Sequence, residues 1–102
     1  MKLYMMEVVI QKSKKADKKF DAIIDGKKTI PFGSKMHSDF TLHKDEARKQ
    51  RYINRHEERE NWQDPKTAGF YSRWLLWNKP TLKSSVDDLN KRYKNINCIL
   101  RN

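Results

Sequence analysis

The side chains that could hold a metal ion are few and widely spaced. Four residues carry soft ligand atoms: His37, His43, His56 and Cys98. Zinc sites use pairs at short spacing, such as two residues four apart on a helix. The nearest pair here, His37 and His43, is six positions apart. We therefore expect neither a metal site nor a cofactor, and interpret the histidines as ordinary polar or half-buried side chains.

Nucleophilic catalysis would need Cys98 or a serine beside a histidine and an orienting acid. Cys98 lies in an apolar run, which is typical of a small buried side chain. The sequence has no Gly-x-Ser-x-Gly, phosphate-loop or dinucleotide-loop motif. We therefore expect no enzymatic activity and no small-molecule substrate. An enzyme would require a pocket in which His43 or His56 meets Asp39 or Glu57.

Basic side chains are the most frequent groups with binding chemistry. The chain has 23 Lys and Arg against 13 Asp and Glu, a formal net charge of +10. Residues 41–64 are neutral, so the surplus comes from the segments on either side. A positive field speeds encounter with DNA, RNA or an acidic protein without choosing among them. The candidate partner-binding residues in these flanking segments are Lys12, Lys14, Lys15, Lys91 and Arg92.

The neutral segment contains a regular series of bases, Lys44, Arg48, Arg51 and Arg55. Their spacing of four, three and four residues predicts one stripe along a helix. Such a stripe could enter a nucleic-acid groove, or meet carboxylates of another protein through bidentate bonds. A third interpretation, which we favour, is that neighbouring acids neutralise it, because the segment carries no net charge.

Aromatic residues gather in one later segment, as Trp62, Phe70, Tyr71, Trp74 and Trp77. Aromatic rings can stack on unpaired bases. Because the chain has few apolar residues, we expect most of these aromatic side chains to form the core instead, where each buried ring removes a large area from water. Trp62 precedes a predicted turn, and we expect it to face a partner.

Hydrophobic periodicity predicts an N-terminal antiparallel hairpin or meander. The first strand should place Tyr4, Met6, Val8 and Ile10 on one face. Asp25-Gly26 is a strong signal for a two-residue hairpin turn. Pro31 lacks a backbone donor, so its strand should either lie at an edge of the sheet or end there. The strands predicted in this region are Leu3–Gln11, Phe20–Ile24 and Lys28–Phe32, with a short fourth at Ser38–Leu42.

Three helices should follow, and then a C-terminal strand. The predicted helices run from His43 or Lys44 to about Glu58, over Ala68–Trp77 and over Leu82–Lys94, and the strand is Ile96–Leu100. Strands followed by helices indicate an α+β fold, here one domain over residues 1–102. Mean hydropathy is −1.04, and no apolar run is long enough for a membrane span. One cysteine and no apolar leader lead us to expect a soluble, reduced, intracellular protein.

Three sequence segments, taken in their order along the chain, are more informative than the amino-acid composition. They are Phe32–Asp45 with its Phe-Gly-Ser-Lys and Ser-Asp-Phe-Thr runs, Arg51–Trp62, and Thr67–Leu82 with Leu-Trp-Asn-Lys-Pro-Thr-Leu. In this order they resemble a family of small basic proteins encoded by large nucleocytoplasmic DNA viruses. The resemblance implies a viral, non-secreted protein and implies no reaction.

Two functions are therefore expected. The first is a structural virion protein, a minor capsid component made in the host cytoplasm or virus factory, docking on acidic surfaces of larger capsid proteins. The alternative is a nucleic-acid-binding protein on packaged double-stranded DNA, with Trp62 as a stacking residue. One contiguous basic face would favour DNA, whereas bases scattered and paired with acids would favour protein contacts.

Overall fold

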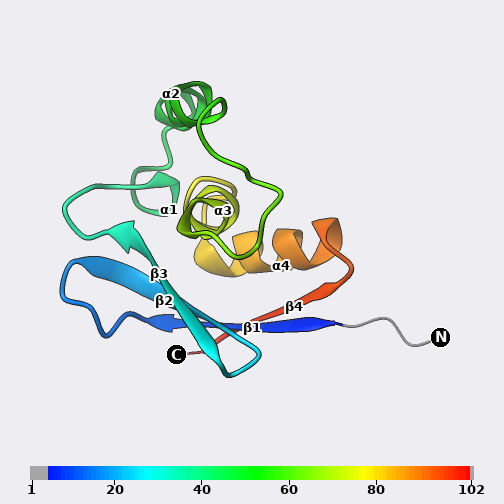
Figure 1. Ribbon diagram of the computed structural model, residues 1–102. Helices are drawn as coiled ribbons and strands as arrows, with labels where there is room; N and C mark the ends of the chain where they lie inside the picture. The colour runs from blue at the N-terminus through cyan, green and yellow to red at the C-terminus, as the bar shows by residue number, and fades with distance from the viewer. Residues whose placement is uncertain (1–4, 102) are drawn as a thin grey trace.

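Within residues 5–101, four strands form one mixed sheet, and the helices lie on one side of it (Figure 1). The computed structural model describes residues 5–101. The α+β prediction is confirmed. The elements are β1 (Met6–Lys12), β2 (Lys18–Ile24), β3 (Lys28–Ser34), α1 (Phe40–His43), α2 (Glu46–His56), α3 (Ala68–Tyr71), the π-helix η1 (Ser72–Leu76), α4 (Leu82–Arg92) and β4 (Ile96–Leu100).

The sheet has the strand order β3-β2-β1-β4. Strands β1, β2 and β3 pair antiparallel, whereas β4 returns after the helices and pairs parallel to β1. Asp25 and Gly26 take φ values of 52° and 67°, the two positive angles of a type I′ turn. The predicted turn is confirmed, and so is the edge position of Pro31, which lies in β3.

The sheet buries the face that the alternation predicted. Met6, Val8 and Ile10 of β1 are all buried, and Tyr4 lies outside the described residues. The hydrophobic core lies between this face and the layer formed by α3, η1 and α4. Its buried members are Met6, Val8, Ile10, Ala22, Ile24, Ile30, Phe32, Phe70, Tyr71, Trp74, Leu75, Leu76, Val86, Leu89, Ile96 and Cys98.

The predicted short strand at Ser38–Leu42 is wrong, because Asp39 begins a helix there. Its carboxylate accepts hydrogen bonds from the Thr41 backbone N–H and hydroxyl, which caps α1. Lys44 then ends α1 in the left-handed region, at φ 56°. The long basic helix α2 consequently begins at Glu46, with Asp45 as its N-cap, and it ends at His56 rather than Glu58.

The predicted helix Ala68–Trp77 also differs in the structure. It starts as expected, with the Thr67 hydroxyl accepting from the Phe70 N–H, but widens into the π-helix η1 at Ser72. The Trp77 N–H donates to the Ser72 carbonyl, five residues back. This wider turn buries three consecutive side chains, Trp74, Leu75 and Leu76. Helix α4 ends at Arg92 rather than Lys94, because Tyr93 is already extended.

Strand β4 lies at the edge of the sheet, and the side chain of Asn90 covers part of that edge. Its amide accepts from the Cys98 backbone N–H at 2.7 Å and donates to the Cys98 carbonyl at 3.0 Å. Burial also raises the pKa of the Cys98 thiol to about 12, so the side chain stays a neutral thiol. The prediction of a small buried cysteine is confirmed.

Asn90→Ala is expected to lower the free energy of unfolding by about 1–3 kcal/mol, because it leaves two backbone groups of Cys98 without these partners. It should also allow slow self-association through the uncovered strand edge. Urea denaturation and analytical ultracentrifugation measure the two effects. Asn97→Ala, at an exposed position on the same strand, is the matched control. A variant at position 90 as stable and as monomeric as this control would show that the edge needs no cover.

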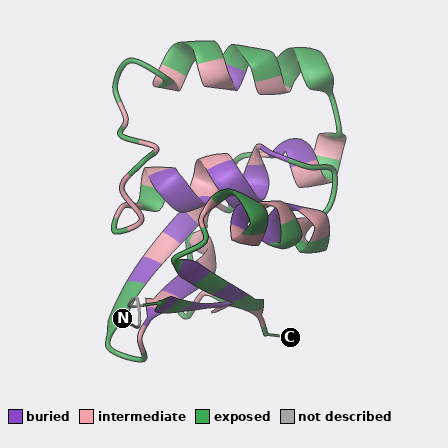
Figure 2. Cartoon of the chain, turned by 90° about the vertical axis from the view of Figure 1, so that its right-hand side faces the viewer, coloured by how far each residue is buried: buried purple, intermediate pink, exposed green. Residues whose placement is uncertain are grey.

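Helix α2 stands apart from the layer that packs on the sheet. Figure 2 shows it exposed along most of its length, and Tyr52 is its buried residue. Within residues 5–101 no helix is long and apolar enough to cross a membrane. The space between α2 and the rest of the molecule contains the candidate site.

Candidate anion-binding cleft

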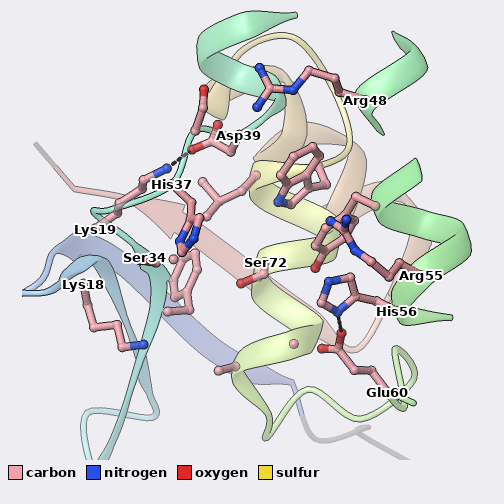
Figure 3. A pocket seen from close by; sticks show the side chains of 18 residues that line it. Lys18, Lys19, Ser34, His37, Asp39, Arg48, Arg55, His56, Glu60 and Ser72 are labelled. Atoms are coloured by element: carbon pink, nitrogen blue, oxygen red, sulfur yellow. Dashed lines mark hydrogen bonds and ion pairs between the residues drawn. The ribbon is translucent and has the colours of Figure 1, made fainter. Parts of the chain in front are cut away.

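A cleft of about 530 Å³ opens between the end of β3, helix α2 and the α3–η1 segment (Figure 3). Four elements supply its walls. Lys18 and Ser34 come from paired ends of β2 and β3, Arg48 and Arg55 from α2, and Ser72 from η1. Charged side chains therefore surround a space that no single motif in the sequence defines.

Three cations of the cleft lack an acidic partner within the described part of the chain. Lys18, Arg48 and Arg55 form no ion pair with any residue among 5–101. Both arginines are exposed, and Lys18 is half-buried. Their charges are therefore available to a ligand, whereas an ion-paired base would first have to break its existing contact.

The two carboxylates of the cleft, by contrast, are already committed. Asp39 is 2% exposed and receives the Lys19 ammonium at 2.5 Å while it caps α1. Glu60 lies 2.5 Å from Nδ1 of His56, one helical turn away. Because each acid has its own base, the cleft as a whole is positive.

The pairing of His56 with Glu60 depends on the absence of a side chain at Gly69. A Cβ at position 69 would lie 2.0 Å from the Glu60 carboxylate oxygen Oε1. With Nδ1 turned toward Glu60, the imidazole has Nε2 left for another partner. A histidine held in this way can bind an anion when protonated.

Gly69→Ala is expected to move the Glu60 carboxylate and release His56 with little change in stability. The gain in helix propensity, about 0.5–1 kcal/mol, is similar in size to the loss of a partly exposed ion pair. Imidazole ¹⁵N chemical shifts report the His56 environment directly. They should move to the values found in Glu60→Gln, which removes the same contact without touching Gly69. Wild-type shifts in Gly69→Ala would show that the carboxylate does not depend on this space.

A stack of rings attaches α2 to the rest of the molecule beside the cleft. Tyr52 lies on Trp77 with ring centroids 4.4 Å apart and an interplanar angle of 2°, and His56 stacks on Tyr52 at 4.4 Å. Burial raises the pKa of Tyr52 above its ordinary value, so its phenol stays neutral. Aromatic contacts therefore help to hold the wall formed by α2 in place.

His43 contacts the same stack and has a structural role. Its ring lies 5.3 Å from that of Trp77, and its Nδ1 accepts a hydrogen bond from the Asp45 N–H at 2.9 Å. Burial lowers the pKa of His43, and the charge of Arg48 lowers it further. Of the histidine–carboxylate pairings considered from the sequence, none forms as written: His56 meets Glu60 instead of Glu57.

Trp62, expected to face a partner, is half-buried and forms internal contacts. Its carbonyl accepts hydrogen bonds from the Trp74 indole N–H and the Tyr93 hydroxyl. The Arg73 guanidinium lies 5.4 Å from its ring centroid. Phe70, Tyr71 and Trp74 are buried, so the prediction that most aromatics form the core is confirmed for them.

The remaining predicted binding residues are divided by the fold. Lys44 is not on the helical stripe, because it lies before α2 and its ammonium donates to the Thr41 carbonyl at 2.7 Å. Arg51 is exposed on α2 but does not line the cleft. Lys12, Lys14 and Lys15 are exposed at the end of β1 and in the β1–β2 loop.

The bases of α4 lie away from the cleft. Lys91 is exposed, and Arg92 binds Asp88 at 2.6 Å and lies 4.5 Å from the ring of Trp74. Figure 1 places this end of α4 on the other side of the molecule from the end of β3. Within residues 5–101 no three His, Cys, Asp or Glu side chains gather as metal ligands would.

Sequence reasoning missed Lys18, His37, Glu60 and Gly69 as parts of one site. The four-residue spacing of His56 and Glu60 was a usable signal, since residues four apart share a helix face. The others carry no local signal. Lys18 and His37 reach the cleft only because β2 pairs with β3 and the chain turns back after Ser34.

Residues 8–56 match a family of unknown function (DUF5754). The matched segment runs from β1 to the end of α2, so it includes Lys18, Asp39, Arg48 and Arg55 of the cleft. No curated protein and no solved structure matched the chain.

Proposed function

We propose that the protein is a non-enzymatic binding protein that holds nucleic acid through this cleft. The observation that supports the proposal is the contrast between its two kinds of charge. Both carboxylates have a bonded base, whereas Lys18, Arg48 and Arg55 have no acidic partner among the described residues. Two arginine forks and one ammonium suit phosphate oxygens, which accept several charge-assisted hydrogen bonds at once.

Further lysines extend the positive charge outward from the cleft. The β1–β2 loop carries Lys14 and Lys15 and runs directly into Lys18. The turn after β3 is tied to this loop, because the Lys35 N–H donates to the Asp17 carbonyl at 3.0 Å. A strand held in the cleft would therefore meet further lysines at one end, which favours a chain of phosphates over a single acidic group.

The salt dependence of binding tests this function. Each phosphate contact should contribute about −0.7 to the slope of log K against log salt for a single strand, so three contacts predict about −2. Fluorescence anisotropy with a labelled oligonucleotide measures the slope. Lys91→Gln, outside the cleft, is the control and should leave the slope near the wild-type value. A wild-type slope near zero would contradict nucleic-acid binding.

The same samples test whether the protein is an enzyme. His56, whose Nδ1 contacts Glu60, is assigned a binding role in which only its imidazolium form donates Nε2–H to a phosphate oxygen. Oligonucleotide recovered after prolonged incubation should therefore be intact by mass spectrometry. Shortened products that disappear in His56→Asn would overturn the non-enzymatic assignment while leaving binding in place.

As a second candidate we propose a minor capsid component of a virion that docks on acidic capsid proteins. Two large apolar side chains next to the basic region favour it: Met36 is 84% exposed and Leu42 is 64% exposed. Exposed apolar groups are typical of a protein interface rather than of a phosphate contact. The virion location is inferred from the resemblance of residues 32–82 to proteins of large DNA viruses.

Purified virions would separate the two candidates. After gentle removal of the genome, a capsid component should remain with the shell. Crosslinking mass spectrometry should then link peptides that contain Met36 to a larger capsid protein. A protein that leaves with the DNA would support the nucleic-acid function and exclude docking on the shell.

A further inference from the structure

The face of the sheet that points away from the helices is open. Figure 1 shows the helices gathered on the other side of the four strands. The β1–β2 loop covers one corner of the open face, where the Ser13 hydroxyl and the Lys14 N–H donate to the Asp21 carboxylate. A sheet with one face toward water normally carries polar side chains on that face. Apolar side chains there consequently need an explanation.

Three β-branched side chains cross the open face in a straight row. Val9 of β1 is aligned with Ile23 of β2 on one side and with Ile99 of β4 on the other. They alternate with core residues such as Val8, so their side chains lie on the face opposite the helices. Ile99 is 42% exposed, and Met5, which has the same alternation just before β1, is 54% exposed. A contiguous apolar strip of this kind is typical of a protein interface, unlike apolar side chains scattered singly.

The open face does not carry the positive surplus of the chain. The charged residues that share the alternation of the row are Glu7, Lys19, Asp21, Asp25 and Arg101. The Lys19 ammonium is already bound to Asp39. The chain as a whole has a formal net charge of +10, and the unpaired cations of the cleft lie on the helix side of the sheet. Two copies of the chain therefore meet with less repulsion through the open face than through the cleft.

The two ends of the open face have opposite charges. Glu7 precedes Val9 by two residues on β1, whereas Gln11 follows it by two, and Gln11 accepts a hydrogen bond from the Arg101 guanidinium at 3.1 Å. Both Glu7 and Arg101 are exposed. A two-fold axis that runs along the apolar row exchanges the two ends, so Glu7 of one copy comes opposite Arg101 of the other. The same axis places each apolar residue of the row against its own equivalent.

We infer that a second copy of this chain docks on the open face, with the two sheets back to back and Glu7 of each copy opposite Arg101 of the other. The self-complementary positions of the charges favour a second copy over an unrelated partner, for which they would serve no purpose. This interface is separate from the cleft. The two clefts of the dimer therefore face outward on opposite sides and stay open.

The size of the open face sets the strength of the contact. Strand β1 has five aligned residues with each neighbour, and strands lie about 4.8 Å apart with a rise of about 3.3 Å per residue. The face therefore covers roughly 300 Å² per copy, well below the roughly 800 Å² per partner of a stable complex. We expect a weak dimer in fast exchange, with a Kd on the order of 100 µM. The protein should be monomeric at a few micromolar, so this contact differs from the slow strand-edge association expected of Asn90→Ala.

Sedimentation equilibrium of the full chain tests the inference. The weight-average mass should rise from 12.3 kDa toward twice that value between about 10 and 500 µM protein. The rise should be larger at about 0.5 M than at about 0.15 M NaCl, because salt screens the repulsion between two chains of charge +10. Nucleic-acid binding has the opposite salt dependence, so the two properties succeed or fail separately. A monomer at every concentration in both salts would overturn the inference.

Ile99→Lys places a charge in the middle of the apolar row and should weaken the dimer at least about tenfold. Ile99 is partly exposed, so the variant should keep a cooperative urea transition. Leu42→Lys is the matched control, because it adds the same charge at an exposed apolar position on α1, on the helix side of the sheet. A dimer weakened equally by both variants, or by neither, would mean that the contact does not use the open face.

Exchanging the two charges tests the two-fold arrangement itself. Glu7→Arg and Arg101→Glu should each weaken the dimer about tenfold, because each places like charges opposite one another. The double variant restores opposite charges and should recover the wild-type Kd. Arg101→Glu also lowers the net positive charge, so a dimer limited only by general repulsion would become tighter in this variant. Tighter association there, or no recovery in the double variant, would rule out the proposed pairing.

Discussion

Asp39→Ala is expected to lower the free energy of unfolding by about 3–5 kcal/mol, the cost of leaving one member of a buried ion pair without its partner. The Asp39 carboxylate is almost inaccessible and accepts from Lys19, from the Thr41 N–H and from the Thr41 hydroxyl. The substitution strands the Lys19 ammonium, which is itself 14% exposed, and removes the cap of α1. Urea denaturation with an unchanged m-value would measure the loss.

Two further variants assign this loss to its causes. Lys19→Met combined with Asp39→Leu removes both charges and should recover part of the stability but not the cap. Asp17→Ala, an exposed acid in the nearby loop, should change stability by less than about 0.5 kcal/mol. A loss below about 1 kcal/mol in Asp39→Ala would show that water, and not Lys19, satisfies the carboxylate.

Arg48→Gln combined with Arg55→Gln is expected to weaken nucleic-acid binding about 100-fold, because each lost charge-assisted contact costs about a factor of ten. The salt slope should become less negative by roughly 1.4, or 0.7 for each phosphate contact. Both side chains are exposed and unpaired among residues 5–101, so the thermal unfolding midpoint should stay the same. Anisotropy titrations at several salt concentrations measure both the affinity and the slope.

Lys44→Gln combined with Arg51→Gln is the matched control for that pair. It removes the same net charge from the same region, but neither residue lines the cleft. It should weaken binding less than about threefold through the general field alone. Equal losses in the two double variants would mean that net charge, and not the cleft, determines affinity.

Local patterns predicted most of the fold because they have local causes. The turn at Asp25-Gly26 and the edge position of Pro31 each follow from the chemistry of one or two residues. The error at Ser38–Leu42 has a local cause too. Its alternating pattern resembles a strand, but Asp39 at the start of the segment stabilises a helix end.

The candidate site was predicted only in part, because a cleft is a property of the tertiary structure. Arg48 and Arg55 stood out by their spacing, yet the same spacing wrongly included Lys44. The zero net charge of residues 41–64 predicts that neighbouring acids neutralise the basic stripe. Net charge does not show, however, which of these acids already bind another base. Glu60 is bound to His56 and so does not pair with Arg55.

The pairing of β4 with β1 has a consequence for biosynthesis. Met6 aligns with Ile96 and Ile10 with Leu100, so β1 gains its second neighbour only from a segment made about 90 residues later. A nascent chain that ends before residue 96 leaves one side of β1, including Val8, without a strand. The fourth strand can therefore join the sheet only after residues 96–100 have been translated. Truncated chains that lack β4 should be degraded quickly by proteases.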